Sequence, residues 1–217
     1  MTVKTNGNMN IRKIVARLHL WLGIVSSVPV VIICATGVTY ALREYISYEN
    51  EDFWTWILDG HCFLWLPLPY GRYITGYTVL AFLVILISGV ITQWPGRWTI
   101  EALRKRFWFS GPIRTKRVLM NLHLVLGLWA LLPLAVSCLT GMLMALDWLQ
   151  SIVFMIVPEE YQIDVLMLNS EIHDGSIMGH TGRIIMLVCA TIGGTLPLTG
   201  LVLYIRRKLL FKRKGVK

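Results

Sequence analysis

Histidines are the side chains of this sequence best suited to bind a metal ion, and their positions follow a pattern. The chain contains five of them: His19, His61, His123, His173 and His180. His19 lies seven residues after Arg12, and His123 lies seven residues after Lys116. At about 1.5 Å per helical residue, each ring would lie roughly 10 Å along its helix from a basic segment. The spacing predicts two imidazoles at one depth, near one membrane surface.

A second pair of histidines precedes two apolar runs. His61 and His173 lie at matching distances before runs that begin near residues 73 and 184, which predicts a second pair at the opposite, outer surface. His180 has no counterpart in the other half of the chain. It lies seven residues after His173 and is an alternative to it as a ligand, or a residue for substrate or interfacial contacts.

Two facing imidazoles favour one kind of cofactor. A haem iron takes two axial ligands from opposite faces of the porphyrin, and facing helices with apolar walls can supply them. Zinc usually takes three or four clustered ligands, and a proton relay needs acidic groups within the spans. This sequence has no acidic residue there. The pattern therefore predicts two haem b groups. Ordinary hydrogen bonding at the membrane surface remains the alternative for each histidine.

Three arginines lie near the predicted sites: Arg17, Arg72 and Arg183. A guanidinium group there could pair with a haem propionate. The alternative is that these side chains extend to the membrane surface as topology charges.

The elements that position these residues are four long apolar runs. They cover Ile14–Leu42, Tyr73–Gln93, Val118–Leu146 and Ile184–Ile205 in a chain that is 55% hydrophobic and only 15% charged. A bilayer core of about 30 Å needs about 20 helical residues, so each run is long enough to cross it. The sequence therefore predicts an all-α membrane protein with four spans and a lipid bilayer as its surroundings.

The charges alternate in sign between these runs. Residues 1–17 carry +4, 43–72 carry −3, 95–117 carry +6, 147–183 carry −5 and 206–217 carry +7. Basic segments stay on the cytoplasmic side of a membrane, so both termini are expected there. The net charge of +9 is thus a topology signal, and a nucleic-acid partner is not expected.

The chain matches itself when it is shifted by 104 residues. Residues 12–42 and 116–146 are identical at 11 of 31 positions, and the identities include His, Pro, Cys and a Thr-Gly pair. A weaker match relates the second run to the fourth. This predicts one transmembrane domain over 1–217, a four-helix bundle of two tandem helical hairpins, 12–96 and 116–206, joined by a basic cytoplasmic loop, 97–117.

Several cofactor motifs are absent from the sequence. It has no G-x-G-x-x-G, no Walker loop and no cysteine cluster. Neither a nicotinamide domain nor an iron–sulfur centre is therefore expected. Electrons would have to come from a quinol or from a separate cytoplasmic donor.

Three stretches of the sequence resemble the PepSY-associated transmembrane helix family: RLHLWLG with a later Thr-Gly, GRYITG, and IHDGSIMGHTGR followed by TGLVLYIRRK. That family includes haem-containing membrane reductases of ferric siderophores. The resemblance implies haem ligation by His19, His61, His123 and His173, and iron reduction on the periplasmic face of a bacterial inner membrane. Many members carry extra-membrane PepSY domains, whereas the outer loops here are short, so a partner subunit could be required.

We therefore expect an inner-membrane di-haem cytochrome that passes electrons to a periplasmic ferric siderophore or another ferric complex and so aids iron acquisition. This would make the protein an oxidoreductase of the ferric reductase type. Two alternatives stay open: a cytochrome b anchor subunit of a larger oxidoreductase, and a haem-free permease or assembly factor of an iron-uptake system.

Overall fold

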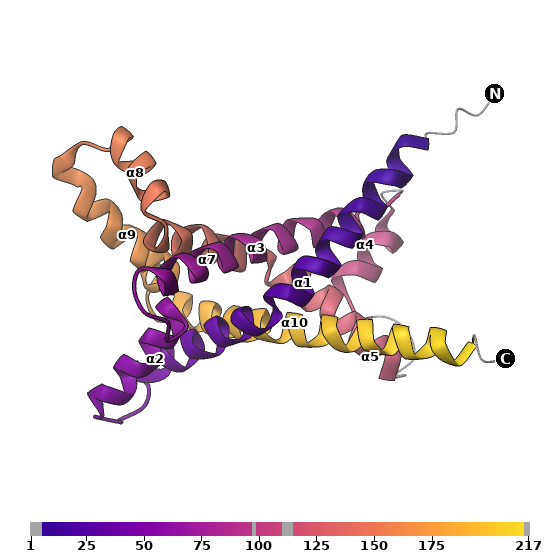
Figure 1. The fold of residues 1–217 in the computed structure, drawn as a ribbon, viewed down its shortest axis with the longest axis horizontal. Coiled ribbons are helices and arrows are strands. Elements are labelled where there is room, and N and C mark those ends of the chain that lie inside the picture. The colour runs from indigo at the N-terminus through magenta and orange to yellow at the C-terminus, as the bar shows by residue number, and fades with distance from the viewer. Residues whose placement is uncertain (1–5, 97–98, 110–114, 215–217) are drawn as a thin grey trace.

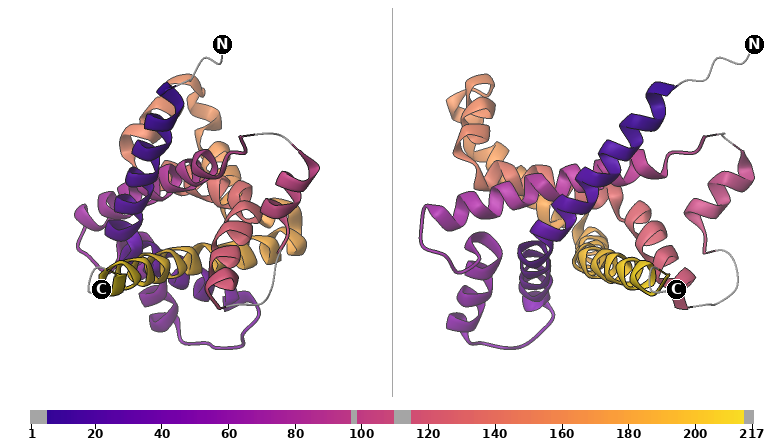
Figure 2. Two further views of the ribbon diagram at one scale, coloured as in Figure 1. Left: turned by 90° about the vertical axis from the view of Figure 1, so that its right-hand side faces the viewer. Right: turned by 45° about the vertical axis from the view of Figure 1, so that its right-hand side comes forward.

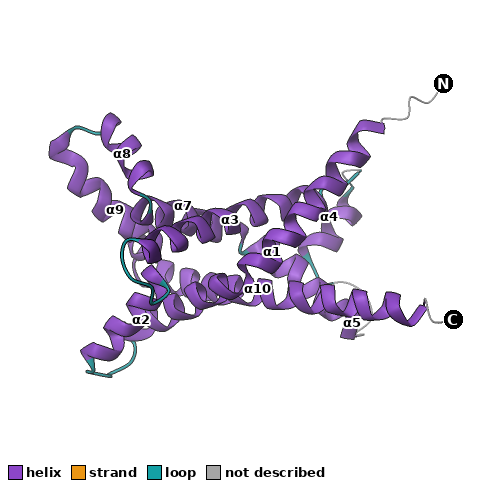
Figure 3. Ribbon diagram, viewed as in Figure 1, coloured by secondary structure: helices purple, strands orange, loops and turns teal. Residues whose placement is uncertain are grey.

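The structure is a computed structural model that describes residues 6–96, 99–109 and 115–214. Within these ranges the chain forms helices and loops and no strands (Figure 3). The predicted loop 97–117 contains the short helix α4 (Ile100–Phe107), while residues 97–98 and 110–114 lie outside the described residues. The all-α prediction is confirmed.

The other helical segments, in chain order, are α1 (Asn6–Ala41), η1 (Leu42–Glu44), α2 (Glu51–Phe63), α3 (Tyr70–Gln93), α5 (Thr115–Asn121), η2 (Leu122–Leu126), α6 (Gly127–Trp129), α7 (Leu131–Ala145), α8 (Asp147–Ile156), η3 (Glu159–Tyr161), α9 (Gln162–Asp174), η4 (Ser176–Met178) and α10 (Gly179–Lys214).

Three helices are long and apolar enough to cross a membrane: α1, α3 and α10. A fourth candidate span consists of two pieces, Val118–Trp129 and Leu131–Ala145, which meet at an angle of 61°. The described residues thus contain three continuous candidate spans, or four if the bent pair counts as one.

The bend interrupts the third apolar run, which the sequence predicts as one continuous span. It lies at Ala130, three residues before Pro133. The ring of a proline removes a backbone donor from a helix. The Trp129 indole nitrogen donates to the carbonyl of Phe107 (3.0 Å), and its ring lies 5.9 Å from that of Trp108. These contacts hold the first piece against the segment after α4, away from the axis of α7.

The spans form a ring when the molecule is viewed along its length (Figure 2, left). α1 packs against both α3 and α10, and α7 closes the ring by packing against α3 and α10. The first turns of α1 and the last turns of α10 lie at the same end of the molecule (Figure 1). The short helices α2, α8 and α9 lie at the opposite end, where α2 packs on α1 and α9 packs on α7.

A small apolar core fills the centre of the ring. Buried Val30, Phe82, Leu134 and Leu196 come from all four spans and contact one another. Large apolar side chains also face outward, such as Val25, which is 76% exposed. A soluble protein rarely exposes so much contiguous apolar surface, so these faces fit the hydrocarbon of a bilayer.

Candidate functional site

The first pair of histidines, His19 on α1 and His123 on η2, lies between the spans. We call it the inner pair because it lies toward the end where α1 begins and α10 ends. The two ring centres are 6.4 Å apart and the ring planes are nearly perpendicular, at 88°. η2 is a turn of π-helix. Such a turn is a local widening that occurs often at functional sites. The predicted pairing of His19 with His123 is therefore present in the fold.

Hydrogen bonds fix the tautomer of both inner rings. His19 Nδ1 donates to the carbonyl of Ile85 (3.1 Å) and lies 2.9 Å from the Ser88 hydroxyl, which itself donates to Ile85. His123 Nδ1 lies 2.9 Å from the hydroxyl of Thr199, whose proton is directed to backbone oxygens of its own helix. A carbonyl can only accept, so Nδ1 of His19 carries the ring proton and Nε2 keeps a lone pair. The same holds for His123, because its ring also bonds to the backbone carbonyl of Leu196.

The second pair, His61 on α2 and His173 on α9, forms the outer pair. Their ring centres are 6.1 Å apart. His61 Nδ1 donates to the carbonyl of Ile33 (2.9 Å), and His173 Nδ1 lies 2.9 Å from the hydroxyl of Thr140. Burial lowers the pKa of His61, and it lowers that of His173 to about 4. Both outer rings are therefore neutral at pH 7. The carbonyls of Ile33 and Ser137 accept from His61 and His173, so the lone pair of each ring lies on Nε2.

Each of the four rings lies over a glycine on a neighbouring helix. A Cβ atom added to Gly37 would lie 2.8 Å from Cε1 of His61, and one added to Gly141 would lie 3.1 Å from Cε1 of His173. The corresponding distances for Gly89 with His19 and Gly200 with His123 are 3.4 and 3.3 Å.

Every one of these glycines follows a Ser or Thr, and the four pairs are Thr36-Gly37, Ser88-Gly89, Thr140-Gly141 and Thr199-Gly200. The glycine admits the ring because it has no side chain. The hydroxyl, or the carbonyl three residues before it, accepts the Nδ1 proton. We call each pair a histidine seat. Such pairs also suit the close approach of two helices or of a flat ligand. The sequence signal for their contact with histidine is that each pair recurs at an equivalent place in the two halves of the chain, as the histidines do.

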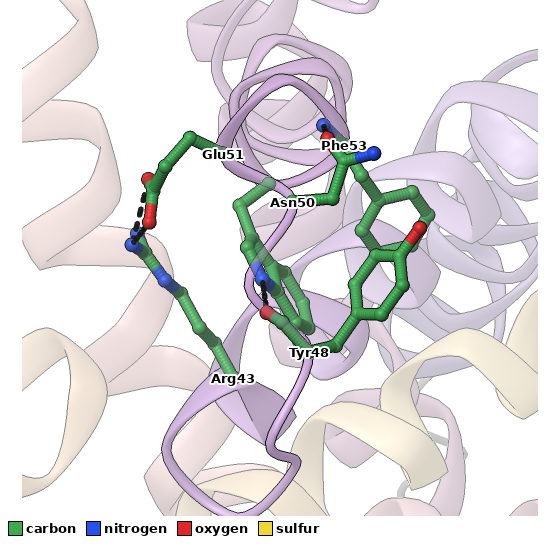
Figure 4. A network of polar contacts seen from close by, with 6 residues as sticks. Arg43, Tyr48, Asn50, Glu51 and Phe53 are labelled. Carbon is green, nitrogen blue, oxygen red and sulfur yellow. Dashed lines mark hydrogen bonds and ion pairs between the residues drawn. The ribbon is translucent and has the colours of Figure 1, made fainter.

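Capping and ion pairing at the start of α2 position His61 (Figure 4). The Asn50 side chain accepts a hydrogen bond from the backbone nitrogen of Phe53 (3.0 Å), as an N-cap residue does. Both oxygens of Glu51 contact the Arg43 guanidinium group, at 2.6 and 2.8 Å. The buried indole of Trp54 donates to the carbonyl of Tyr48 (2.7 Å). Together these contacts fasten α2 to the segment that follows α1.

Two contacts fasten α9, which carries His173. The buried Asn169, one turn before His173, donates to the carbonyl of Thr140 (3.1 Å). At the end of α9, Gly175 has a positive φ of 81° and lies in backbone contact with Gly182 at the start of α10. Thr140 therefore contacts α9 twice, through its carbonyl and through its hydroxyl.

A cavity of about 770 Å³ surrounds the inner pair. Its walls are mainly apolar, with Phe82, Leu86 and Leu196 among them, and its lining also includes Arg206 and Arg207. An added Cβ at Gly23, one turn after His19, would meet no atom within 4 Å, so this side of α1 is open to the cavity. The volume and the apolar walls are those of a site for an organic cofactor. Sequence reasoning missed both arginines.

Two other predicted site residues, Arg72 and Arg183, form ion pairs with carboxylates. Arg72 contacts the carboxylate of Asp147 (2.7 Å) and donates to the carbonyl of Met144 (2.9 Å), and Arg183 pairs with Glu44. Their predicted pairing with propionates stays a prediction.

His180 and Arg17 lie away from the two ring pairs. The exposed His180 ring lies 5.5 Å from the ring of Tyr45, so the geometry favours His173 over His180 as the partner of His61. Arg17 lines a separate groove beside the cavity.

The ring distances bear on which metal groups the site could hold. Two imidazoles bound to opposite sides of one ion, with metal–nitrogen bonds of about 2.0 Å, would have ring centres about 6.3 Å apart. The observed values are 6.4 and 6.1 Å. Among the described residues no group of three or more His, Cys, Asp or Glu side chains is suited to a metal ion. The arrangement thus fits an ion that takes only two ligands from the protein.

The fold and its apolar spans define an all-helical membrane protein. A family model, the PepSY-associated TM region, matches residues 47–162. This is more than half of the 217 residues, and the chain belongs to that family. The matched range contains His61 and His123, whereas His19 and His173 lie outside it. No curated protein and no solved structure matches the chain.

Proposed function

We propose that the chain is a di-haem b-type cytochrome of a bacterial inner membrane, in which His19 and His123 hold one haem and His61 and His173 hold the other. The observation that carries the proposal is the pair of ring separations, 6.4 and 6.1 Å. Such separations suit two imidazoles on one iron. The fixed Nδ1 proton on each ring leaves Nε2 as the donor atom, as second-sphere contacts to a ligating histidine normally do.

We further propose that the chain is two tandem hairpins with both termini in the cytoplasm. The internal match of the sequence and the alternating loop charges support this topology. The inner pair would then lie near the cytoplasmic surface and the outer pair near the periplasmic one. His19 lies on α1, and so does Gly37, against which the ring of His61 packs. At about 1.5 Å per residue they are roughly 27 Å apart along the helix. That distance is close to the thickness of a bilayer core.

The residues around each site would bind and orient the cofactor. The histidine seats keep the rings neutral and at fixed angles. The apolar walls of the inner cavity exclude water from the ring faces. Arg206 and Arg207 would pair with carboxylates at the cavity mouth. The bound iron supplies a reversible one-electron change at each site.

Electron transfer across the bilayer is the activity we propose. A cytoplasmic donor or a quinol would lose one electron at the inner side, and a periplasmic Fe³⁺ complex, such as a ferric siderophore, would gain it and become Fe²⁺. Such a reduction loosens the chelate and aids iron acquisition. A partner subunit could supply the substrate pocket, because the outer segments are short.

A reduced-minus-oxidised absorbance spectrum of the purified full-length protein tests the proposal. We expect the bands of low-spin b-type haem and a content of about two haems per chain, because each pair supplies both axial ligands of one iron. Protein expressed with haem precursors that shows no Soret absorbance would support a haem-free permease or assembly factor instead.

Thr140→Val tests the seat of His173. It keeps the size of the side chain but removes the hydroxyl that lies 2.9 Å from Nδ1 of His173, which leaves the backbone carbonyl of Ser137 as the partner of that ring. We expect the outer haem to transfer about tenfold faster to a haem-scavenging protein, because loss of a second-sphere partner typically weakens metal binding about 10- to 100-fold. Thr36→Val is the matched control, since the His61 ring bonds to the Ile33 carbonyl rather than to the Thr36 hydroxyl. Equal transfer rates in the two variants would contradict this role.

A further inference from the structure

A groove of about 730 Å³ lies between the inner ends of α1 and α10, outside the ring of spans. Three cationic side chains line it: Arg17 from α1, and Arg207 and Lys208 from α10. No carboxylate occurs among the described residues that line it. Three cations in one groove create a positive potential there, so the groove is complementary to a negatively charged group.

The other lining residues are mainly apolar, and we call them the apolar floor of the groove. Ala16 and Leu20 lie on one side and Leu209 on the other. Leu209 is 59% exposed, so the surface next to the cations suits hydrocarbon rather than water. The groove therefore combines cationic and apolar side chains, which matches a ligand with an anionic head and an acyl tail.

The depth of the groove agrees with such a ligand. Arg17 lies two residues before His19, and Lys208 lies eight residues after Gly200. The second interval corresponds to about 12 Å along α10. The Lys208 ammonium group also lies 5.1 Å from the centre of the Tyr204 ring, which holds it beside the groove. These positions are at the basic ends of two candidate spans, where the headgroups of one leaflet lie.

We propose that this groove binds an anionic phospholipid, with its phosphate between Arg17, Arg207 and Lys208 and an acyl chain along the apolar floor. Basic pockets between membrane helices bind anionic headgroups in this way. The groove also shares Leu20, Tyr204 and Arg207 with the cavity of the inner pair. A bound lipid would thus form part of the wall at the cavity mouth. The groove is distinct from the proposed cofactor sites but shares Arg207 with the mouth of the inner cavity, so the test below leaves Arg207 unchanged.

Titration of the purified full-length protein with dioleoylphosphatidylglycerol tests the proposal, with lipid binding counted by native mass spectrometry and the thermal unfolding midpoint followed in parallel. The variant is Arg17→Gln/Lys208→Gln. The matched control is Arg12→Gln/Lys13→Gln, which removes the same charge from exposed positions on α1 that do not line the groove. Dioleoylphosphatidylcholine and inorganic phosphate serve as alternative ligands.

We expect tight binding of one phosphatidylglycerol per chain and a higher unfolding midpoint. Each cation that contacts the headgroup changes lipid affinity about fivefold, so the groove variant should bind about 25-fold more weakly. The control variant should bind less than about twofold more weakly, because Arg12 and Lys13 do not line the groove. Equal losses in the two variants would show a general surface attraction and overturn the proposal. It would also fail if phosphatidylcholine bound as tightly, or if inorganic phosphate alone gave the full stabilisation.

Discussion

His19→Ala/His123→Ala is expected to lower the haem content of the purified protein from about two per chain to about one, because both axial ligands of the proposed inner site are removed. The two rings lie 6.4 Å apart in a cavity of about 770 Å³, and Nε2 of each is the nitrogen with a lone pair. The remaining spectrum should be that of the outer haem alone. Pyridine haemochrome quantification and a reduced-minus-oxidised spectrum measure both effects.

The mirror variant, His61→Ala/His173→Ala, should keep the inner haem and lose the outer one. His180→Ala is the control, because His180 contacts Tyr45 and belongs to neither ring pair. It should keep about two haems per chain and an unchanged spectrum. Retention of both haems by the inner double variant would rule out ligation by His19 and His123, even if the wild-type protein contains haem.

Gly182→Ala is expected to cause the largest loss of stability among the glycine substitutions. A Cβ atom at this position would overlap the backbone oxygen of Gly175 and lie 2.7 Å from Cβ of Met178. Backbone cannot move aside as a flexible side chain can, so α9 and α10 would have to separate. We expect the free energy of unfolding to fall by at least about 2 kcal/mol. His173 lies two residues before Gly175, so the outer haem should also be lost.

Gly96→Ala is the control for this substitution. An added Cβ at Gly96 meets no atom within 4 Å. The change in the free energy of unfolding should therefore stay within about 0.5 kcal/mol. Thermal unfolding in detergent, followed by circular dichroism, measures both variants. Similar unfolding midpoints for Gly182→Ala and wild type would show that the contact with Gly175 does not hold α9 in place.

The histidine pairs could be predicted from the sequence because the internal match gives their depth. His19 and His123 occupy equal positions in two similar runs, and equal positions in parallel spans of one bundle lie at one level. The choice between His173 and His180 could not be made in this way. Both lie near the start of the same span, and only the packing of α9 on α7 brings His173 to His61.

The role of the histidine seats could not be predicted from the sequence, for a different reason. Thr140-Gly141 and Ser88-Gly89 are evident in the sequence. A small residue beside a hydroxyl, however, is also what close helix packing requires. Their role depends on which neighbouring helix faces them. That is a property of the tertiary arrangement and has no local signal.

The break in the third span also could not be predicted from the sequence. Pro29 and Pro133 occupy matching positions, yet α1 continues through Pro29 while the helix breaks three residues before Pro133. The difference arises from contacts outside the span, since the indole of Trp129 donates to the carbonyl of Phe107 at the end of α4. A proline therefore shows where a helix can bend, and the surrounding contacts decide whether it does.

The placement of each ring and its seat on different helices has a consequence for the lifetime of the protein in a cell. His19 joins α1 to α3, His123 joins η2 to α10, and His173 joins α9 to α7. A group that bridges two rings would bind only the assembled bundle, so its binding free energy would add to the free energy of helix association. Cofactor supply would then set the fraction of chains that resist membrane proteases, and iron status would control the abundance of the protein without any change in its synthesis.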